Sequence, residues 1–352
     1  MSPKKQACYF SPYDNHRWLM ERMEQSLSYA NACGGELKAW QNKLRRKLRQ
    51  LTGYDKMPKP AERCALDVRT EWEQERHEGF IRKIIFQSEE HAHVPAYVCL
   101  PRSATPPYRF VICVQGHSSG MHNSIRVERD DEAKTFSPKC DRDFGITAMQ
   151  SGLAALCIEQ RAFGLRREQT LEKAMSGTCH DATMHALMLG RTMIAERVFD
   201  IDRGIDYLAT RDDADMKRIG VMGNSGGGTA SLFSAALLPR ISLCMPSCYF
   251  CTFRDSVMSI GHCMDNYVPG LLQYAEMPDL MGLFAPKPVV VVAGREDNIF
   301  PIDATEKAFR ALKKIYKAAG ASDRCKLVIG EGGHRFYAQA AWPEYLKMLE
   351  RI

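Results

Sequence analysis

The stretch GVMGNSGGGTASLFSAALL, residues 220–238, changes its structural pattern abruptly. The apolar run at 219–222 predicts a strand, and the apolar periodic run from Thr229 onward predicts a helix. The six residues between the two runs are four glycines, one asparagine and Ser225. A serine at the corner of a strand-to-helix turn, among glycines that let other backbone approach closely, is the arrangement of a nucleophile elbow.

The G-x-S-x-G pattern around Ser225 is weak evidence alone, because chance produces it in roughly one chain of ten of this length. Its position between a predicted strand and a predicted helix makes it more specific. Such a turn projects the Ser225 hydroxyl over the edge of the sheet, and the helix offers the backbone N–H of Gly226 to a developing oxyanion. The alternative is a phosphate-binding turn. It is disfavoured because the chain has no G-x-x-x-x-G-K-[ST] pattern and no well-placed dinucleotide fingerprint.

A serine hydroxyl becomes a good nucleophile when a base takes its proton, and in this kind of fold the acid and then the histidine follow the serine. His334 ends the run EGGH (331–334) after the last predicted strand and is the only histidine beyond the candidate acids. Those acids, Glu296 and Asp297, come directly after the predicted strand at 288–294. A turn aspartate and a surface histidine are the alternatives, but the required order of the three elements favours a catalytic triad.

The glycine-rich loop QGHSSG, residues 115–120, follows the predicted strand that begins at residue 109. In this kind of fold the second N–H group of the oxyanion hole comes from such a loop. The backbone N–H groups of His117 and Gly226 are therefore the predicted oxyanion donors. The imidazole of His117 is expected to have a structural role.

Strand and helix patterns alternate from about residue 109 to the end, after an initial pair of strands at 79–88 and 94–101. The run PVVVVAG at 288–294 is typical of a strand that is covered on both faces. This order predicts an α/β fold with a doubly wound, mainly parallel sheet. Every candidate residue above then lies at the carboxyl end of a strand, where α/β sheets bind their ligands.

The N-terminal part has a different pattern, because residues 1–60 look helical. One apolar stripe there recurs at three- and four-residue spacing: Leu37, Trp40, Leu44, Leu48 and Leu51. Basic residues occupy the other faces, so a membrane or nucleic-acid surface is one alternative, but packing against the chain's own domain is favoured. We therefore predict an N-terminal helical extension at 1–74 and a catalytic domain at 75–352, with a small cap segment at about 252–286.

The composition is that of an ordinary globular protein. The 352 residues are 45% hydrophobic and 26% charged, and the net charge of +6 is too small and too dispersed to indicate nucleic-acid binding. No apolar run approaches the roughly 18 residues of a transmembrane helix, so no membrane partner is expected. Thirteen cysteines without a secretory signal predict a reducing, cytoplasmic location.

One cysteine cluster suggests a zinc site as an alternative: CMPSCYFC at 244–251, with His262 and Cys263 nearby. Zinc ligands usually come as two spaced pairs, whereas these cysteines overlap a predicted strand and its exit loop. Since free cysteine is among the most buried residue types, buried thiols are the favoured interpretation and no metal is predicted.

Together these motifs resemble those of the α/β-hydrolase superfamily, and within it the dienelactone hydrolase-like and acetyl xylan esterase-like proteins. The resemblance spans roughly residues 75–340. It rests on HALMLGRTMIAERVFDIDRGIDYLATR before the elbow, GNSGGGTAS at it, YVPGLLQYAEMPDL after it, and GREDNIFP and EGGHRF near the C-terminus. The resemblance implies that Asp297 is the acid of the triad, because the G-x-x-D-x-x-x-P turn is similar to the acid loop of many α/β-hydrolases.

The chain departs from these relatives at two positions. Gln115 stands where relatives commonly carry the first histidine of His-Gly-His, and Ser225 stands where the dienelactone hydrolases proper have a cysteine. Arg161, in the family-like loop EQRAFG, either faces the site and holds an anionic or sugar group or is a buried salt-bridge partner. Gln115, Arg161 and Tyr267 of the cap are the candidate substrate-binding residues.

The predicted function is that of a serine carboxylic-ester hydrolase working through an acyl-enzyme. Ser225 attacks the ester carbonyl, His334 accepts its proton, and Asp297 orients the imidazole. The resemblance implies deacetylation of a carbohydrate or a small ester. No cofactor is expected, and a homo-oligomer is left open. The alternatives are a serine peptidase, a lactone hydrolase, or a non-catalytic binding protein on the same scaffold.

Overall fold

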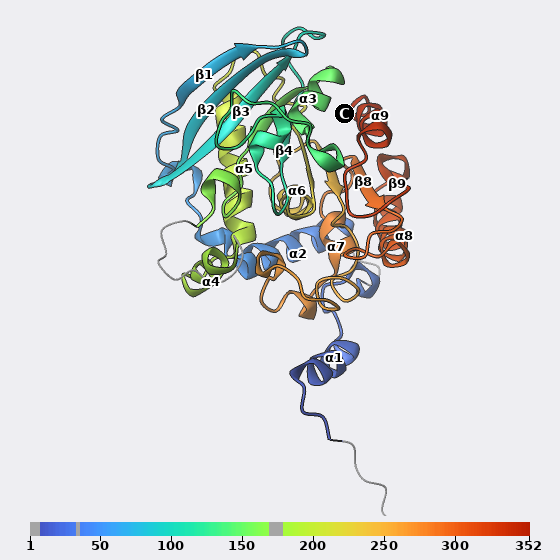
Figure 1. Ribbon diagram of the computed structural model, residues 1–352. Helices are drawn as coiled ribbons and strands as arrows, with labels where there is room; N and C mark the ends of the chain where they lie inside the picture. Colours follow the sequence, from blue (N-terminus) through green and yellow to red (C-terminus); the bar gives the residue numbers. More distant parts are fainter. Residues whose placement is uncertain (1–7, 33–35, 169–178) are drawn as a thin grey trace, which may run out of the picture.

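The computed structural model describes residues 8–32, 36–168 and 179–352. One nine-stranded sheet runs through the described part, with helices on both of its faces (Figure 1). The strands are β1 (Arg69–Glu75), β2 (Gly79–Glu89), β3 (Ala92–Pro101), β4 (Phe110–Val114), β5 (Ala154–Ile158), β6 (Gly220–Asn224), β7 (Leu243–Ser247), β8 (Val289–Gly294) and β9 (Cys325–Gly330). They lie in the order β1-β2-β3-β5-β4-β6-β7-β8-β9.

The sheet is antiparallel at one end and parallel over the rest. The pairs β1–β2, β2–β3 and β3–β5 are antiparallel. From β5 through β4 and β6 to β9 every pair is parallel. The central strands β4 to β8 are buried along their whole length, which is why their sequences are nearly continuous apolar runs. The predicted α/β class, with a doubly wound and mainly parallel sheet, is confirmed.

Nine α-helices occur among the described residues. They are α1 (Pro12–Arg22), α2 (Leu37–Thr52), α3 (Phe144–Gln150), α4 (His180–Met188), α5 (Met193–Ala209), α6 (Gly226–Leu237), α7 (Met277–Gly282), α8 (Ile302–Ala318) and α9 (Ala338–Leu349). Helices α3 and α9 contribute Phe144 and Trp342 to one buried cluster. Helices α5, α6 and α8 contribute Ile205, Phe233 and Leu312 to the larger cluster on the other side. Within the described ranges no helix combines the length and the apolar character needed to cross a membrane.

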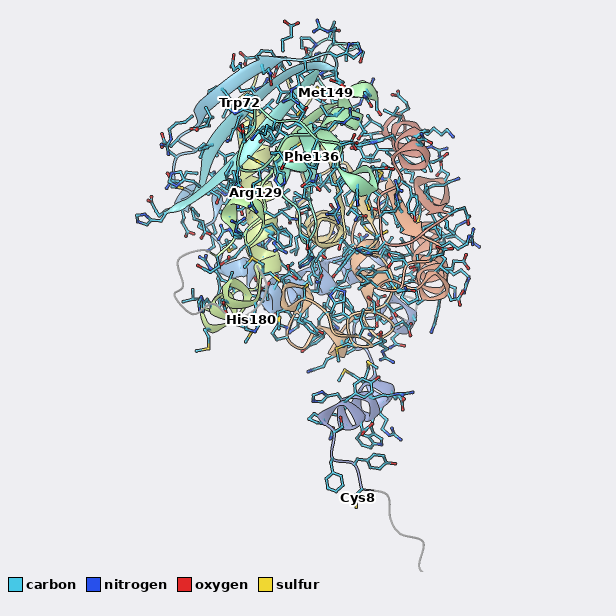
Figure 2. All side chains as sticks on the ribbon, in the orientation of Figure 1. Cys8, Trp72, Arg129, Phe136, Met149 and His180 are labelled. Atoms are coloured by element: carbon cyan, nitrogen blue, oxygen red, sulfur yellow. The ribbon has the colours of Figure 1, made fainter. Side chains whose placement is uncertain are left out.

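Residues 69–74, expected to belong to the helical extension, instead form the edge strand β1 together with Glu75. The strand is almost entirely polar and exposed, so its sequence lacks the apolar alternation that would predict it. Trp72 is its one partly buried residue (Figure 2). Its ring packs against Tyr97, with 5.7 Å between centroids, and its indole N–H donates to Glu132. Pairing with β2 and this one anchor therefore hold the edge strand.

Helix α2 packs into the main core, as its apolar stripe predicts. Leu44 and Leu48 are fully buried in the larger cluster. The Gln41 amide donates to the carbonyls of Gly282 and Ala285 at 3.0 and 2.8 Å. Helix α1, by contrast, buries no residue and protrudes from the rest of the chain (Figure 1), and its Tyr13, His16 and Met20 line a cavity with residues 254–261. The division of the chain between residues 74 and 75 stays a prediction.

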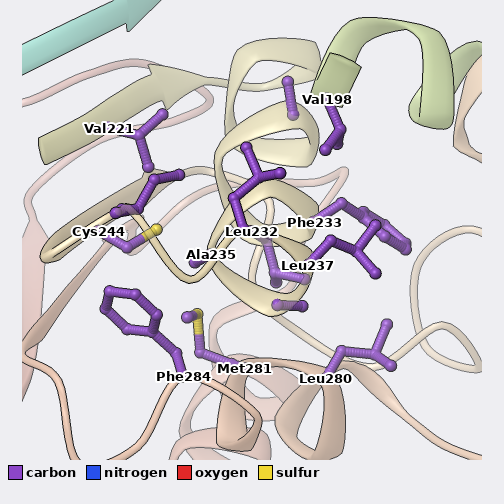
Figure 3. Close-up of a cluster of buried hydrophobic side chains, with 14 of the residues drawn as sticks. Val198, Val221, Leu232, Phe233, Ala235, Leu237, Cys244, Leu280, Met281 and Phe284 are labelled. Carbon is purple, nitrogen blue, oxygen red and sulfur yellow. The ribbon is translucent and has the colours of Figure 1, made fainter. Parts of the chain in front are cut away.

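The C-terminal part of the predicted cap segment is core. Figure 3 shows Leu280, Met281 and Phe284 gathered with Leu232 and Phe233 of α6, and all five belong to the larger buried cluster. The part before α7, residues 252–276, is made of turns and short 3-10 helices. Only this first part of the segment is therefore placed to cover a site.

Substituting Leu48→Ala tests whether α2 is needed for the fold. Because the side chain is fully buried, we expect the free energy of unfolding to fall by about 2–5 kcal/mol. The matched control is Leu19→Ala in α1, where the leucine is 46% exposed and the change should stay within about 0.5 kcal/mol. Urea unfolding followed by circular dichroism measures both. Equal stability of the two variants would mean that α2 contributes little to the folded state.

Candidate active site

Ser225 occupies the corner between β6 and α6, where the sequence predicts the nucleophile elbow. Its backbone has φ 59° and ψ −120°, a conformation that side-chain-bearing residues rarely adopt and that stores strain at functional sites. Two hydrogen bonds hold the corner. The Ser225 N–H donates to the Ser247 carbonyl at 2.9 Å, and the Ser225 carbonyl accepts from the Thr229 N–H at 2.9 Å. The side chain is half-buried at the carboxyl edge of the sheet.

The glycines that flank Ser225 are required by close backbone contacts. A Cβ atom at Gly227 would lie 2.0 Å from the Val114 carbonyl oxygen, and one at Gly223 would lie 2.4 Å from the same atom. No side chain fits at either position, so α6 can start directly against β4. The glycines of the G-x-S-x-G pattern are thus needed because the elbow passes very close to the neighbouring strand β4.

His334 and Asp297 are brought together at the same edge. Because β6, β8 and β9 run parallel, the loops after them, which carry Ser225, Asp297 and His334, leave the sheet on one side. His334 Nδ1 lies 2.8 Å from Asp297 Oδ2. His334 Nε2 is buried and has no hydrogen-bond partner in the described structure. Asp297 thus holds Nδ1 of the imidazole, whereas Nε2 remains able to accept a proton.

The structure distinguishes the two candidate acids. Glu296 is exposed, whereas Asp297 is 4% exposed. Burial alone would raise the pKa of Asp297, but the hydrogen bond and charge of His334 hold that pKa below its usual value. The backbone N–H groups of Ile299 and Phe300 donate to Oδ1 at 2.8 and 3.1 Å and act in the same direction. Of the two candidate acids, Asp297 is the one that contacts His334.

The loop after β4 lies against the elbow. A Cβ atom at Gly116 would be 2.6 Å from the Asn224 carbonyl oxygen and 3.0 Å from the Ser225 Cβ. The His117 imidazole would be 3.0 Å from a Cβ at Gly226. It also meets Phe163 edge to face, with 4.7 Å between ring centroids. The loop at Gly116 and the imidazole of His117 thus lie beside the first residue of α6, and the pair of oxyanion donors stays a prediction.

The sequence patterns did not predict that His117 belongs to a buried row of charged side chains with Asp265 and Arg197. Asp265 accepts from Arg197 at 2.6 Å and lies 3.1 Å from His117 Nε2. Burial opposes the charge on both His117 and Asp265, yet their contact raises the pKa of His117 to about 9, and Arg197 helps to hold the pKa of Asp265 far below its usual value. The signal available in the sequence was Arg197 itself, a charged residue on the apolar face that Ile194 and Ile201 define.

Arg161 is a buried salt-bridge partner, the second of the two roles that the sequence allows. Its guanidinium lies 2.9 Å from Asp200, 3.2 Å from Glu196 and 2.7 Å from Glu89. Burial opposes its charge, but these carboxylates raise the pKa of Arg161 well above its ordinary value. Its donors are used within the fold, so the geometry offers no free guanidinium to a substrate.

The two other candidate substrate-binding residues also have intramolecular partners. The Gln115 amide is buried and donates to Ser124 Oγ at 2.8 Å and to the Arg142 carbonyl at 2.6 Å, so it joins loops behind the site. The Tyr267 hydroxyl donates to the Val257 carbonyl at 3.0 Å, and the residue as a whole is 37% exposed. Only Tyr267 presents surface that a substrate can contact.

The thiols of the CMPSCYFC run are buried at Cys244, Cys248 and Cys251. They do not gather into one set of metal ligands among the described residues. Cys248 alone has ligand-forming neighbours, Asp297 and His334, with ligand atoms within 4.8 Å of one another. The favoured interpretation of buried thiols agrees with this placement.

Comparisons with known proteins bear on the family. A model of the Abhydrolase family matches residues 2–328. The "Putative hydrolase YtaP" of Bacillus subtilis (strain 168) is 26% identical over 281 residues, which cover 78% of this chain and 88% of that protein. The "Carbohydrate esterase MZ0003" of an unknown prokaryotic organism is 25% identical over 208 residues, which cover 54% of this chain and 42% of that protein.

A solved structure extends the likeness to the fold. The crystal structure of a "putative acetyl xylan esterase" from Bacteroides fragilis NCTC 9343 matches with a TM-score of 0.73 and 15% identity, covering 99% of this chain and 91% of that one. At this identity the match establishes only the fold, so the reaction has to be inferred from the residues of the site. Because the family model covers nearly the whole sequence, the chain belongs to the Abhydrolase family of α/β-hydrolases.

Proposed function

We propose that the protein is a serine carboxylic-ester hydrolase that acts through an acyl-enzyme. The observation that carries the proposal is the 2.8 Å contact between His334 and Asp297, at the sheet edge where Ser225 holds a strained corner. A histidine oriented by a buried carboxylate is the base that a serine nucleophile needs. The names of two similar proteins, a carbohydrate esterase and an acetyl xylan esterase, support ester hydrolysis as the reaction class.

The reaction proceeds in two halves. His334 Nε2 takes the hydroxyl proton as Ser225 Oγ attacks the ester carbonyl carbon, and Asp297 stabilises the resulting imidazolium. The N–H groups of His117 and Gly226 donate to the tetrahedral oxyanion. When the intermediate collapses, the alcohol leaves with the proton from His334. Water then attacks the acyl-enzyme with His334 again as base, and the carboxylic acid departs.

The proposed substrates are acetyl esters of carbohydrates or small esters. A screen of p-nitrophenyl esters of increasing acyl length, beside acetylated sugars, tests this proposal. We expect the highest kcat/KM on acetyl esters. Peptide anilides and lactones belong in the same screen, since faster turnover of either would favour the peptidase or lactone hydrolase. Absence of turnover on every substrate class would favour a binding protein on the same scaffold.

Short substrates are expected to react much faster than polymers. The turns at 252–276 reach the site through Asp265, which contacts His117, and through His262, whose ring meets Phe300 beside His334. A long polysaccharide would need an exposed aromatic platform along a groove. The four tryptophans offer none near Ser225: Trp40 and Trp342 are buried, Trp72 lies in the far edge strand, and Trp18 lies in α1. Acetate release from matched acetylated oligosaccharides and intact polymer measures the difference. A higher kcat/KM on the polymer would show that the turns lie beside an open cleft.

A further inference from the structure

Four side chains with metal-binding atoms converge beside the elbow, and the ester-hydrolysis mechanism uses none of these side-chain atoms. One ligand atom of each lies within 4.8 Å of the ligand atoms of the other three. They come from the loop after β4, the residue that precedes α4, and the turn at 263–266. We call this set the four-ligand cluster: His117, Cys179, Cys263 and Asp265.

Two contacts of His117 within the four-ligand cluster have lengths close to those between neighbouring ligands of a tetrahedral site. His117 Nε2 lies 3.1 Å from Asp265 Oδ2 and 3.7 Å from Cys179 Sγ. The two sulfur atoms lie within 4.8 Å of each other. Zinc–nitrogen and zinc–oxygen bonds of about 2.0–2.1 Å and zinc–sulfur bonds of about 2.3 Å place neighbouring ligands about 3.3–3.8 Å apart. A zinc ion therefore needs only small shifts of these side chains.

The charges around the four-ligand cluster also suit a divalent cation. Two thiolates and the Asp265 carboxylate would carry three negative charges, which zinc and the buried guanidinium of Arg197 together neutralise. Arg197 contacts Asp265 at 2.6 Å, and both side chains are almost completely buried. A hydrogen-bonded partner behind a ligating carboxylate is the usual support of a metal site. Without a bound metal, the site holds no further positive charge that a second thiolate could balance.

The His117–Asp265–Arg197 chain alone does not account for the thiols. Cys179 is 4% exposed and packs with Ala162, Phe163 and Met193, which explains its burial. Cys263 packs against the same apolar cluster, but apolar packing does not explain why the Cys179 sulfur lies 3.7 Å from His117 Nε2. Two thiols, an imidazole and a carboxylate from three separate segments form a ligand set typical of zinc.

We propose that the four-ligand cluster is a structural zinc site. All four ligands come from the protein, which leaves no open position for a catalytic water. The ion would fasten the turn at 263–266 and the start of α4 to the loop whose His117 N–H faces the oxyanion. The site is thus separate from the triad, and its occupancy can be measured without any substrate.

The test uses the full chain purified under reducing conditions without chelator. We expect about one zinc per chain by inductively coupled plasma mass spectrometry. After the zinc is exchanged for cobalt, we expect the thiolate-to-cobalt absorption band of a tetrahedral site. Cys179→Ser and Cys263→Ser should each weaken cobalt binding by more than about 100-fold, since loss of an outer hydrogen-bond partner alone costs up to that factor.

Two control variants separate this site from other thiols. Cys64→Ser removes a partly buried thiol outside both groups of candidate ligands. Cys248→Ser removes the thiol beside Asp297 and His334. Both variants should keep the zinc and the cobalt band. Circular dichroism confirms that each variant is folded, and chelator should lower the melting temperature of the parent but not of folded Cys263→Ser.

Three results would overturn the proposal. The first is a parent protein that holds under about a tenth of an equivalent of zinc and gives no thiolate band with cobalt. The second is a Cys179–Cys263 disulfide that persists, without bound metal, in protein purified under reducing conditions. The third is a metal that Cys248→Ser loses while Cys179→Ser and Cys263→Ser keep it, which would assign the ion to the triad.

Discussion

Ser225→Ala is expected to leave the fold intact and to lower kcat for ester hydrolysis by about 10⁴- to 10⁶-fold. The substitution removes the nucleophilic oxygen and nothing that holds the elbow, because Ser225 is fixed there by its backbone N–H and carbonyl. Alanine meets the same backbone strain at φ 59° as serine does, so the melting temperature should change little. Hydrolysis of a p-nitrophenyl acetate series measures the loss.

The matched control is Ser231→Ala on the same helix. The Ser231 hydroxyl donates to the Gly227 carbonyl at 2.8 Å and does not face a substrate, so kcat should stay within a few-fold of the parent. A fluorophosphonate should label the parent and the control at Ser225, as mass spectrometry of the labelled peptide would show. A folded parent that resists the label, or a Ser225→Ala variant with full turnover, would mean that another group attacks the ester.

Much of the architecture could be predicted because its signals are local. The strands at 220–224 and 289–294 are buried on both faces, so they appear as apolar runs in the sequence. The elbow at Ser225 needs small residues where Gly227 meets the Val114 carbonyl, and that need is visible as a glycine pattern. The order of His334 in the chain and its place after the last strand predicted its position, and the structure places it beside Asp297.

Other features depend on contacts between distant segments and leave no local pattern. Asp265 lies in a turn without periodicity, and its role depends on Arg197 and His117, which are 68 and 148 residues away along the chain. Strand β1 is held by pairing and by Trp72, not by an apolar face of its own. Arg161 was ambiguous in the sequence because a guanidinium suits a substrate anion and a buried carboxylate equally well, and only the position of Asp200 decides.

Asp297→Asn is expected to lower kcat by about 10⁴-fold, whereas Glu296→Gln should leave kcat within about two-fold of the parent. The two residues are adjacent in sequence and differ by one change of the same kind, so they form a matched pair. Asp297 is buried against His334, and Glu296 is exposed. Steady-state kinetics on one acetyl ester, with melting temperatures for both variants, makes the comparison. The reverse pattern would move the acid of the triad to Glu296.

The size of the expected Asp297→Asn loss follows from the hydrogen bonds on both oxygens. Oδ1 accepts from the backbone N–H groups of Ile299 and Phe300, so the amide oxygen of an asparagine must take that place. The amide NH₂ then faces His334 Nδ1, which has to present a lone pair instead of a proton. This moves the imidazole proton to Nε2, the atom that must accept the proton of Ser225, so the base is present in the wrong tautomer. Nitrogen-15 NMR of His334 should show that the imidazole proton lies on Nδ1 in the parent and on Nε2 in the variant. An Asp297→Asn variant that keeps the parent's tautomer but still loses activity would require a different cause, such as loss of the stabilising charge.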